Sequence, residues 1–410
     1  MNAKLKYLRF FFIVIAAAFV GVFLAAGCSS DDGVPHRQSL LIYMAGNSNL
    51  STYAYQNLSE LQQGYVPGFC NPGEGDVLLV YFHTAKELPK LYRLYKNNKN
   101  QVTVEQVKEY PAHQSLDPTV MKQVLLEAAE AYPADEYGLV VWSHGSGWLP
   151  QGYYNNPNSY ESGAYAQSSL IPRLEDDPMQ AYVKAVGPDS DIEMDIQALE
   201  AALPVHYDYI IFDACLMSGV EVVYELRNKA DFVLASSAEI LAQGFPYRDY
   251  IRPLLSGDKA QLEEVAKIYF DYYDNKDDYY RSATISLTRT SALESLAMVV
   301  RDIYAAHKEE LLDFDRSNVQ GFNRNNRNYF YDLADFIHQL ATPQERADFE
   351  QALSRVVLYQ AATPEFLGGY AGFRINTHCG LTTYIPSSSE AYLIDFYPTL
   401  AWNEVVEMVD

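Results

Sequence analysis

The sequence predicts an α/β fold with a mainly parallel central sheet and helices on both of its faces. Two observations support this prediction. Short apolar runs rich in strand-forming residues recur between Gln38 and Glu239, and segments with the apolar spacing of a helix separate them. Alternation of this kind is typical of parallel strands joined by crossover helices, and the functional residues of such sheets lie beyond the carboxyl ends of the strands.

The predicted elements form one domain over residues 38–255. Strands are expected at residues 38–46, 76–83, 137–145, 207–215 and 230–239, and helices at 50–65, 117–132 and 191–203. The third of these helices is expected from its apolar spacing, and the second opens with Asp-Pro, which suits an N-cap and first turn. Residues 148–190 show no periodicity, and a loop of that length inside a domain is usually functional or disordered.

Residues 256–410 are expected to form a C-terminal α+β extension, a subdomain packed on the core. Helices are predicted at 260–273 and 291–312, a strand at 282–288, two further helices after the asparagine-rich stretch 323–328, and paired strands near the C-terminus. The whole is therefore expected to be an α/β/α sandwich with this extension attached.

The N-terminus has the features of an export signal. Three basic residues precede an apolar stretch that ends in small residues, so residues 1–27 are predicted to be a signal peptide. Gly27 and Cys28 resemble the lipobox of bacterial lipoproteins, whose cysteine is acylated after cleavage. Residues 28–37 would be an acidic tether, and the protein an outer-membrane lipoprotein of the cell envelope. Simple secretion and an uncleaved anchor are the alternatives.

Charge and cysteine content narrow the function further. The chain carries 30 Lys and Arg against 53 Asp and Glu, a formal net charge of −23. Such a surface repels nucleic acid and suits a soluble ectodomain, and we expect a monomer. Beyond Cys28 three cysteines remain, which cannot all pair in an oxidising compartment. Cys70 and Cys379 occupy loop-like contexts and could form a disulfide, an option that the sequence leaves open.

Two of the predicted strands end in reactive residues, His144 and Cys215. If neighbouring parallel strands present both at one sheet edge, the imidazole can reach the thiol and form the thiolate–imidazolium pair of an activated cysteine nucleophile. The N–H groups of Gly145 and Cys215 could then bind the oxyanion of a tetrahedral intermediate. Ser218 and Glu221 have the spacing of a capping box, and the helix that it opens would stabilise the thiolate.

Other interpretations fit the same residues. A single cysteine at a strand end is more often a small core residue than a nucleophile. The chain would then be a non-catalytic surface lipoprotein that binds protein or glycan through its tyrosine-rich loops. The motif HGSG at residues 144–147 could also be the oxyanion loop of a serine esterase, but no Gly-x-Ser-x-Gly elbow follows it.

Six stretches combine these features: 40–50 (LLIYMAGNSNL), 137–148 (YGLVVWSHGSGW), 209–226 (YIIFDACLMSGVEVVYEL), 232–247 (FVLASSAEILAQGFPY), 331–340 (YDLADFIHQL) and 380–387 (GLTTYIPS). Together they resemble the clostripain family of cysteine peptidases, relatives of caspases, gingipains and legumain. The resemblance implies a caspase-like fold, with His144 as general base and acid, Cys215 as nucleophile and Gly145 in the oxyanion hole. It also implies an endopeptidase that cleaves polypeptides after Arg or Lys, is influenced by calcium in several members, and often matures by a cut in the loop after the histidine.

Basic specificity requires acidic residues in the substrate pocket. The expected substrate-binding residues are Asp213 and Glu239, although Asp213 could instead cap backbone N–H groups at its turn. Two departures from the family pattern weaken the case. Gln243 lies in a turn that is commonly more acidic, and Asn47 stands where an aspartate is expected.

The long loop is the expected place for self-processing. Between Gly145 and Val186 its basic residues are Arg173 and Lys184, and a self-activating enzyme with basic preference is predicted to cut after Arg173. No metal site is predicted and no cofactor is required, with a calcium effect left open. The acid-rich stretch 271–280 could hold a hard cation but is more typical of solvated surface.

Overall fold

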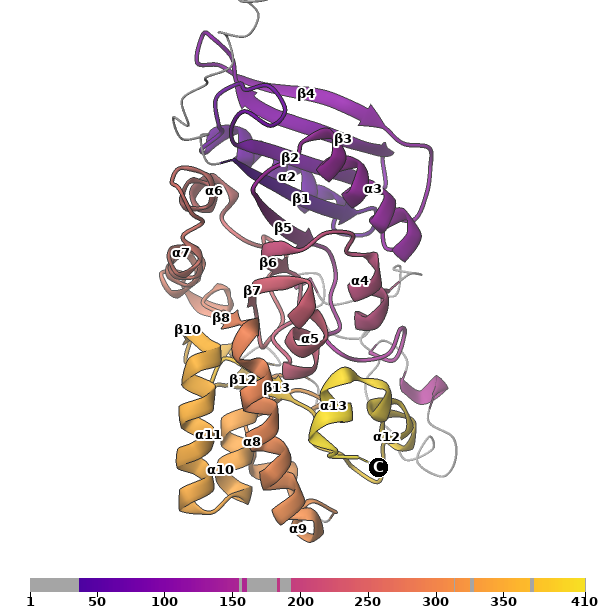
Figure 1. Cartoon of the computed structure of the whole chain (residues 1–410), viewed down its shortest axis with the longest axis vertical. Helices are drawn as coiled ribbons and strands as arrows, with labels where there is room; N and C mark the ends of the chain where they lie inside the picture. The colour runs from indigo at the N-terminus through magenta and orange to yellow at the C-terminus, as the bar shows by residue number, and fades with distance from the viewer. Residues whose placement is uncertain are drawn as a thin grey trace, which may run out of the picture. The chain divides into compact units, whose positions relative to one another are not determined.

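The fold is built on a central sheet to which nine strands of the described residues contribute, in the order β10-β8-β7-β6-β5-β1-β2-β3-β4 (Figure 1). The computed structural model describes residues 37–154, 157–160, 183–184, 193–312, 314–324, 328–368 and 372–409. The chain from Arg37 onward belongs to one compact unit. The sheet strands are β1 (Gln38–Gly46), β2 (Val77–Thr84), β3 (Glu87–Lys96), β4 (Val102–Glu109), β5 (Glu136–Trp142), β6 (Tyr207–Asp213), β7 (Ala230–Ala235), β8 (Thr284–Arg289) and β10 (Val357–Ala362).

The middle of the sheet is parallel. Strands β7, β6, β5, β1 and β2 pair in parallel, and antiparallel strands flank them on both sides. Strands β1 and β2 are buried along their whole length, which agrees with continuous apolar runs covered on both faces. The predicted α/β class with a mainly parallel central sheet is confirmed.

Helices cover both faces of this sheet, as Figure 1 shows for α6 and α7 on one side and α3, α4 and α5 on the other. Helix α2 packs on α6, and α6 packs on α7; α3, α4, α5, α13, α8 and α11 contact one another in turn. The helices are α2 (Ser51–Gln63), α3 (Pro118–Ala131), α4 (Ile196–Ala202), α5 (Val220–Glu225), α6 (Tyr247–Leu255), α7 (Leu262–Asp274), α8 (Leu293–Ala306), α9 (Lys308–Leu312), α10 (Leu333–Leu340), α11 (Pro343–Val356), α12 (Ala391–Phe396) and α13 (Ala401–Val406).

The start of α3 illustrates why the sequence folds locally as it does. The Asp117 carboxylate accepts hydrogen bonds from the N–H groups of Thr119 and Val120, and Pro118 occupies the first helical position. Proline needs no N–H partner there, and its fixed φ suits the helix. The helix predicted at 117–132 is accordingly observed at Pro118–Ala131.

Two parts of the sheet differ from the prediction. The hairpin β3–β4 was not expected, because its strands are half polar and lie at a sheet edge. Residues 256–410 were expected to pack on the sheet, yet two of their strands belong to it: β8 pairs with β7, and β10 pairs with β8. Two short antiparallel pairs complete this part, β9 (Tyr331–Asp332) with β13 (Thr382–Thr383) and β11 (Glu365–Phe366) with β12 (Phe373–Arg374).

The predicted capping box at Ser218 and Glu221 is wrong. Helix α5 begins after Gly219, with no side-chain cap, and the Ser218 hydroxyl bonds to Ser286 at 2.7 Å. The Glu221 carboxylate is buried and accepts bonds from the C-terminal part of the chain instead. Its donors are the Thr383 hydroxyl at 3.0 Å, the Tyr384 N–H at 2.9 Å and the Tyr397 hydroxyl at 2.7 Å. Glu221 therefore fastens α5 to the strand and helices that follow residue 380.

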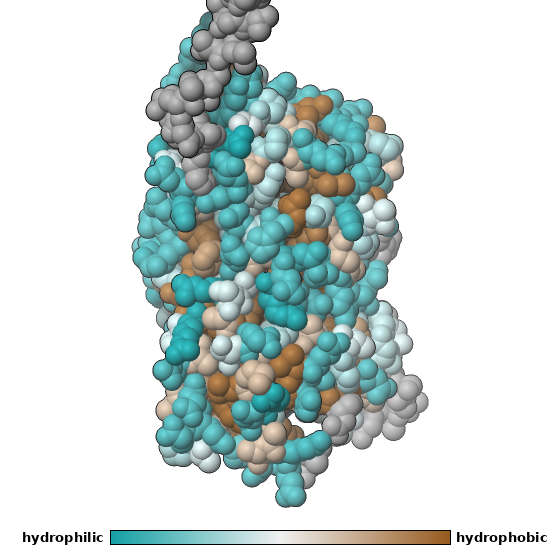
Figure 2. Space-filling view, viewed as in Figure 1, coloured by the Kyte–Doolittle hydropathy of each residue, from teal (hydrophilic) through white to brown (hydrophobic). Residues whose placement is uncertain are grey.

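The surface is mostly hydrophilic on the face that Figure 2 shows, with hydrophobic residues in small separate groups. Within the described part of the chain, no helix is both long and apolar enough to span a bilayer.

Replacing Glu221 should reveal the strength of this connection. We expect Glu221→Leu to lower the free energy of unfolding by about 2–4 kcal/mol, because three buried donors lose their acceptor. Glu221→Gln keeps a carbonyl oxygen in place and should cost clearly less. Urea denaturation followed by fluorescence measures both, and equal stability of the leucine variant and the parent chain would contradict this account.

Candidate active site

The parallel register brings the ends of β5 and β6 to the same sheet edge. Trp142 and Asp213, the last residues of these strands, are paired, and His144 and Cys215 each follow two positions later. The two loops touch, since the Ser143 N–H lies 3.4 Å from the Asp213 carbonyl oxygen. The two residues predicted to carry the chemistry therefore lie on adjacent loops at one edge.

The Cys215 thiol is completely buried. Its Sγ accepts a hydrogen bond from the Ile240 N–H at 3.1 Å. Burial, followed by the negative charge of Glu239, raises the pKa of this thiol well above its ordinary value. The Ile240 N–H and the positive charges of Lys184 and Arg324 act in the opposite direction. In this arrangement Cys215 is a protonated thiol, so it becomes reactive only when its surroundings change.

The turn that carries Cys215 is held by the segment after β7 and not by a helix N-terminus. The predicted support from α5 is absent, because this helix begins at Val220, beyond the turn. Leu216, directly after the cysteine, has φ of 64°, a left-handed conformation that is strained for a bulky residue. Its N–H donates to the Ala238 carbonyl oxygen at 3.0 Å, which keeps the turn in this conformation.

The His144 ring is oriented by contacts on both nitrogens. Nδ1 lies 3.0 Å from the Lys184 carbonyl oxygen, so it carries a proton and donates it. Nε2 lies 2.9 Å from Asn49 Oδ1 and 3.3 Å from the Ser48 hydroxyl, both in the loop after β1. Asn47, the departure from the family pattern, contacts Gln114 in a weak bond of 3.4 Å. Ser48 and Asn49 were not among the predicted site residues.

Gly145 is required by the close approach of its loop to the cysteine. A Cβ at this position would lie 2.4 Å from the Cys215 carbonyl oxygen and 2.9 Å from the Cys215 nitrogen. Any side chain would therefore push the two loops apart. The same approach brings the backbone of Gly145 beside that of Cys215. The oxyanion hole formed by their N–H groups stays a prediction.

Asp213 and Lys184 form a buried ion pair, and the space that the Lys184 side chain occupies beside Asp213 and Trp142 is here called the Asp213 pocket. The Lys184 ammonium lies 2.6 Å from Asp213 Oδ1, and neither side chain is exposed to solvent. Nζ also lies 4.1 Å from the centroid of the Trp142 ring, a cation–π contact. Burial outweighs the attraction of Asp213 and lowers the pKa of Lys184 to about 8. The other Asp213 oxygen, Oδ2, accepts from the Tyr247 hydroxyl at 3.0 Å.

The backbone of Lys184 lies beside the chain that follows β7. Val183 forms an antiparallel bridge with Leu241, and the Lys184 N–H donates to the Ile240 carbonyl oxygen at 2.7 Å. Extended peptides bind to exposed sheet edges by bonds of this kind. Lys184 thus makes three kinds of contact: its backbone N–H pairs as in a strand, its ammonium pairs with the Asp213 carboxylate, and its carbonyl oxygen accepts a hydrogen bond from His144.

Glu239 does not share the pocket of Asp213. Its carboxylate forms a buried ion pair with Arg324, with Nη2 at 2.9 Å from Oε1, and it also accepts a long bond of 3.4 Å from the Tyr154 hydroxyl. The Glu239 charge raises the pKa of the Cys215 thiol and is paired with Arg324, not with the basic side chain beside Asp213. Arg324 lies in the asparagine-rich stretch and had not been predicted as a site residue.

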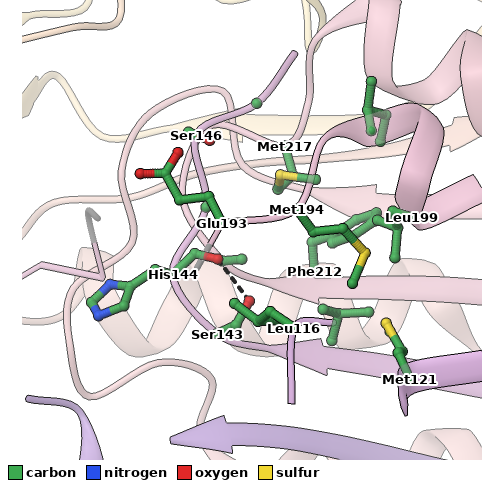
Figure 3. A pocket seen from close by; sticks show the side chains of 15 residues that line it. Leu116, Met121, Ser143, His144, Ser146, Glu193, Met194, Leu199, Phe212 and Met217 are labelled. Carbon is green, nitrogen blue, oxygen red and sulfur yellow. Dashed lines mark hydrogen bonds between the residues drawn. The ribbon is translucent and has the colours of Figure 1, made fainter. Parts of the chain in front are cut away.

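A small cavity lies behind the His144 loop (Figure 3). It measures about 50 Å³, enough for a few water molecules. His144 stands at one end with its ring directed away from the apolar side chains Met121, Leu199 and Phe212. This cavity is apolar at its centre, so the Asp213 pocket is the better candidate for a basic side chain.

The remaining predicted residues have simpler outcomes. Cys70 and Cys379 are free thiols, so the disulfide that the sequence left open is absent. Cys28 and Arg173 lie outside the described residues. Among the residues that the structure describes, no group of three or more His, Cys, Asp or Glu side chains could hold a metal ion.

The residues that were missed differ in how visible they were. Asn49 and Tyr247 lie within the motifs at 40–50 and 232–247, where their polar groups follow strands, so position alone could have indicated them. Lys184 was noted only as a basic residue of the long loop. No pattern in the sequence connects Arg324 with Glu239, which lies 85 positions away.

The charges around Cys215 lead to a prediction about its reactivity. Glu239→Gln removes a negative charge while Arg324 stays, so it should lower the thiol pKa and speed alkylation by iodoacetamide at neutral pH about tenfold. Arg324→Met removes a positive charge that favours the thiolate and should slow this alkylation. Peptide mass spectrometry of the Cys215 peptide as a function of pH measures both. Glu365→Gln, at an exposed position, is the control, and an equal effect there would refute the electrostatic explanation.

The chain matches proteins of one family over most of its length. The model of the clostripain family, peptidase C11, matches residues 42–164 and 175–408. A C11 protease from Parabacteroides distasonis, described as an inactive zymogen, superposes with a TM-score of 0.74 at 28% identity, covering 92% of this chain and 99% of that one. A secreted C11 cysteine protease from Bacteroides thetaiotaomicron, in complex with an irreversible peptide inhibitor, superposes with a TM-score of 0.71 at 29% identity, covering 90% and 99%.

A further relative is clostripain of Hathewaya histolytica, which is 24% identical over 278 residues. The alignment covers 62% of this chain and 48% of clostripain, so this chain matches about half the length of that relative. The breadth of the family match decides the assignment. The chain belongs to the clostripain family of cysteine peptidases.

Proposed function

We propose that this protein is a cysteine endopeptidase in which Cys215 is the nucleophile, His144 is the general base and acid, and Asp213 binds a basic side chain of the substrate. One observation carries the proposal: the side chain and the N–H group of Lys184 lie where those of a substrate residue would, and its carbonyl group lies beside His144. Its ammonium group pairs with the Asp213 carboxylate, its N–H donates to the Ile240 carbonyl oxygen, and its carbonyl oxygen accepts a hydrogen bond from His144 Nδ1. The similar structure with a bound peptide inhibitor supports a polypeptide substrate.

The chemistry follows from these positions. His144 takes the proton of the Cys215 thiol, and the resulting thiolate attacks the carbonyl carbon of the residue in the Asp213 pocket while the N–H groups of Gly145 and Cys215 receive the developing oxyanion. As the C–N bond breaks, His144 gives this proton to the leaving amine. Water then attacks the thioester as His144 takes one of its protons, and the C–S bond breaks as His144 returns that proton to the sulfur, which releases the acid product and restores the thiol. Cys215 and His144 carry out all proton transfers in this scheme. Ser48 and Asn49 contact Nε2 and orient the ring.

Among the acidic residues that the structure describes, Asp213 is the one on which cleavage after a basic residue rests. Glu239 is neutralised by Arg324, and Gln243 supplies no charge. One carboxylate in a solvent-free pocket is still sufficient, because an opposite charge is most effective where water is excluded. Lys184 illustrates this, for its ammonium is held there with no exposure at all.

The same contacts make Lys184 the residue after which the chain cuts itself. Arg173, the candidate from the sequence, lies outside the described residues, whereas Lys184 is bonded to His144 through its carbonyl oxygen and to Asp213 through its ammonium group. With Lys184 in the pocket, no other basic side chain can enter, so the intact chain is a precursor. The buried Cys215 thiol with its raised pKa and the likeness to a structure described as an inactive zymogen agree with this state.

The setting of the enzyme is proposed from the sequence. Residues 1–27 are a signal peptide, and acylated Cys28 anchors a monomer in the outer membrane, with simple secretion and an uncleaved anchor as the alternatives. The likeness to a protease described as secreted supports export. A calcium effect on activity is retained as a proposal without assigned ligands.

Loss of either reactive side chain should abolish hydrolysis. We expect Cys215→Ala and His144→Ala each to lower kcat/KM on a fluorogenic peptidyl-lysine substrate by about 10⁴ or more, because each removes an essential chemical step. Circular dichroism establishes that the variants are folded. Full activity in Cys215→Ala would overturn the mechanism, and a wild-type chain that neither cleaves peptides nor reacts at Cys215 would favour the binding protein instead.

Self-processing should depend on Lys184 and not on Arg173. Incubation of the wild-type chain should yield two fragments whose intact masses correspond to a cut after Lys184. Lys184→Met keeps the length of the side chain but removes its charge, and it should stop this cut, as should Cys215→Ala. Arg173→Ala is the matched control and should be processed at the wild-type rate. Fragments ending at Arg173 would contradict the assignment.

A further inference from the structure

The two oxygens of the Asp213 carboxylate have different partners, and this difference has consequences for the substrate. Oδ1 faces the Lys184 ammonium at 2.6 Å. Oδ2 already accepts two hydrogen bonds, from the Tyr247 hydroxyl at 3.0 Å and from the Phe245 N–H at 3.3 Å. Only one oxygen of the carboxylate is therefore available to a ligand.

Tyr247 cannot easily leave this position. It is the first residue of α6 and is fully buried, and its ring packs edge-on against Tyr250 with centroids 5.0 Å apart. Burial, reinforced by the charge of Asp213, raises the pKa of Tyr247 well above its ordinary value, so its hydroxyl stays protonated and continues to donate.

The wall of the pocket is equally close. Gly244 has φ of 71°, and a Cβ on it would lie 2.5 Å from Asp213 Oδ2 and 2.6 Å from Lys184 Nζ. The backbone of this turn therefore lies directly beside the ammonium. Among the described residues, the other partners of Nζ are the Asp213 carbonyl oxygen at 3.4 Å and the face of Trp142.

Lysine and arginine make different demands on such a pocket. An ammonium is a compact charge that is satisfied by single contacts. A guanidinium is longer and planar, carries five N–H donors, and binds a carboxylate best through both oxygens at once. Here the second oxygen is occupied, and donors left without acceptors in a buried site are costly.

We infer that this pocket selects lysine over arginine before the scissile bond, and that Tyr247 is the residue that sets the preference by occupying Asp213 Oδ2. The inference rests on the proposed function, because it concerns the same pocket. It goes further in separating two basic residues that a single acid would otherwise treat alike.

Two matched substrates that differ only in Lys or Arg before a fluorogenic leaving group provide the first test. We expect processed wild-type enzyme to favour lysine in kcat/KM by about tenfold or more. Tyr247→Phe frees Oδ2 and should reduce this ratio severalfold, mainly by improving the arginine substrate. Tyr269→Phe is the control, because that buried hydroxyl has no hydrogen-bond partner among the described residues. A wild-type ratio near one, or a ratio unchanged by Tyr247→Phe, overturns the inference.

A second test needs no catalysis and separates this inference from the proposed function. In a Cys215→Ala chain, Lys184→Arg places a guanidinium in the pocket, and we expect the melting temperature to fall by about 2–4 °C. Adding Tyr247→Phe should recover part of the loss. If the Cys215→Ala chains with arginine and with lysine at position 184 have the same melting temperature, the pocket does not discriminate, even if the enzyme cleaves peptides. If no peptide is cleaved but the melting shift appears, the proposed function fails and the selectivity of the pocket stands.

Discussion

The buried ion pair between Lys184 and Asp213 is the contact on which the rest of the site depends. Removing either partner would leave a charge without compensation in a solvent-free pocket, typically at a cost of about 3–5 kcal/mol. The pair also fixes the Lys184 backbone, whose carbonyl meets His144 and whose N–H meets Ile240. Yet burial lowers the pKa of Lys184 to about 8, so the pocket holds the ammonium against an opposing desolvation cost. In the proposed precursor, a contact of this kind would order the site and could still be exchanged for a substrate side chain.

The position of the proposed catalytic pair was predictable because it follows from the sheet. Strands β5 and β6 are short, continuous apolar runs, and such runs specify buried parallel strands whose ends share an edge. His144 and Cys215 then lie together by register alone, through the pairing of Trp142 with Asp213. Strand β1 was predicted with its observed ends for the same reason. Wherever local pattern and burial agree, the sequence contains enough information.

The other contacts depend on the tertiary structure. Arg324 reaches Glu239 across 85 positions, and Lys184 reaches Asp213 across 29, so no periodicity could reveal either pair. Glu221 has the spacing of a capping residue, but the C-terminal part of the chain offers its carboxylate three donors in the interior, from Thr383, Tyr384 and Tyr397, and these prevail over a local cap. The hairpin β3–β4 was missed because a half-polar edge strand lacks a distinct hydrophobic pattern.

The backbone N–H and carbonyl groups of Ile240 bind two different partners. Its N–H donates to the Cys215 sulfur, while its carbonyl oxygen accepts the N–H of the residue in the pocket. The main chain that receives a ligand is therefore the same main chain that touches the nucleophile. Consider a peptide whose residue beside Asp213 carries a methyl group on its backbone nitrogen. It would place a methyl carbon against the Ile240 carbonyl oxygen, where Lys184 places an N–H donor. Such a peptide would be rejected at the backbone, whatever side chain it offered to Asp213.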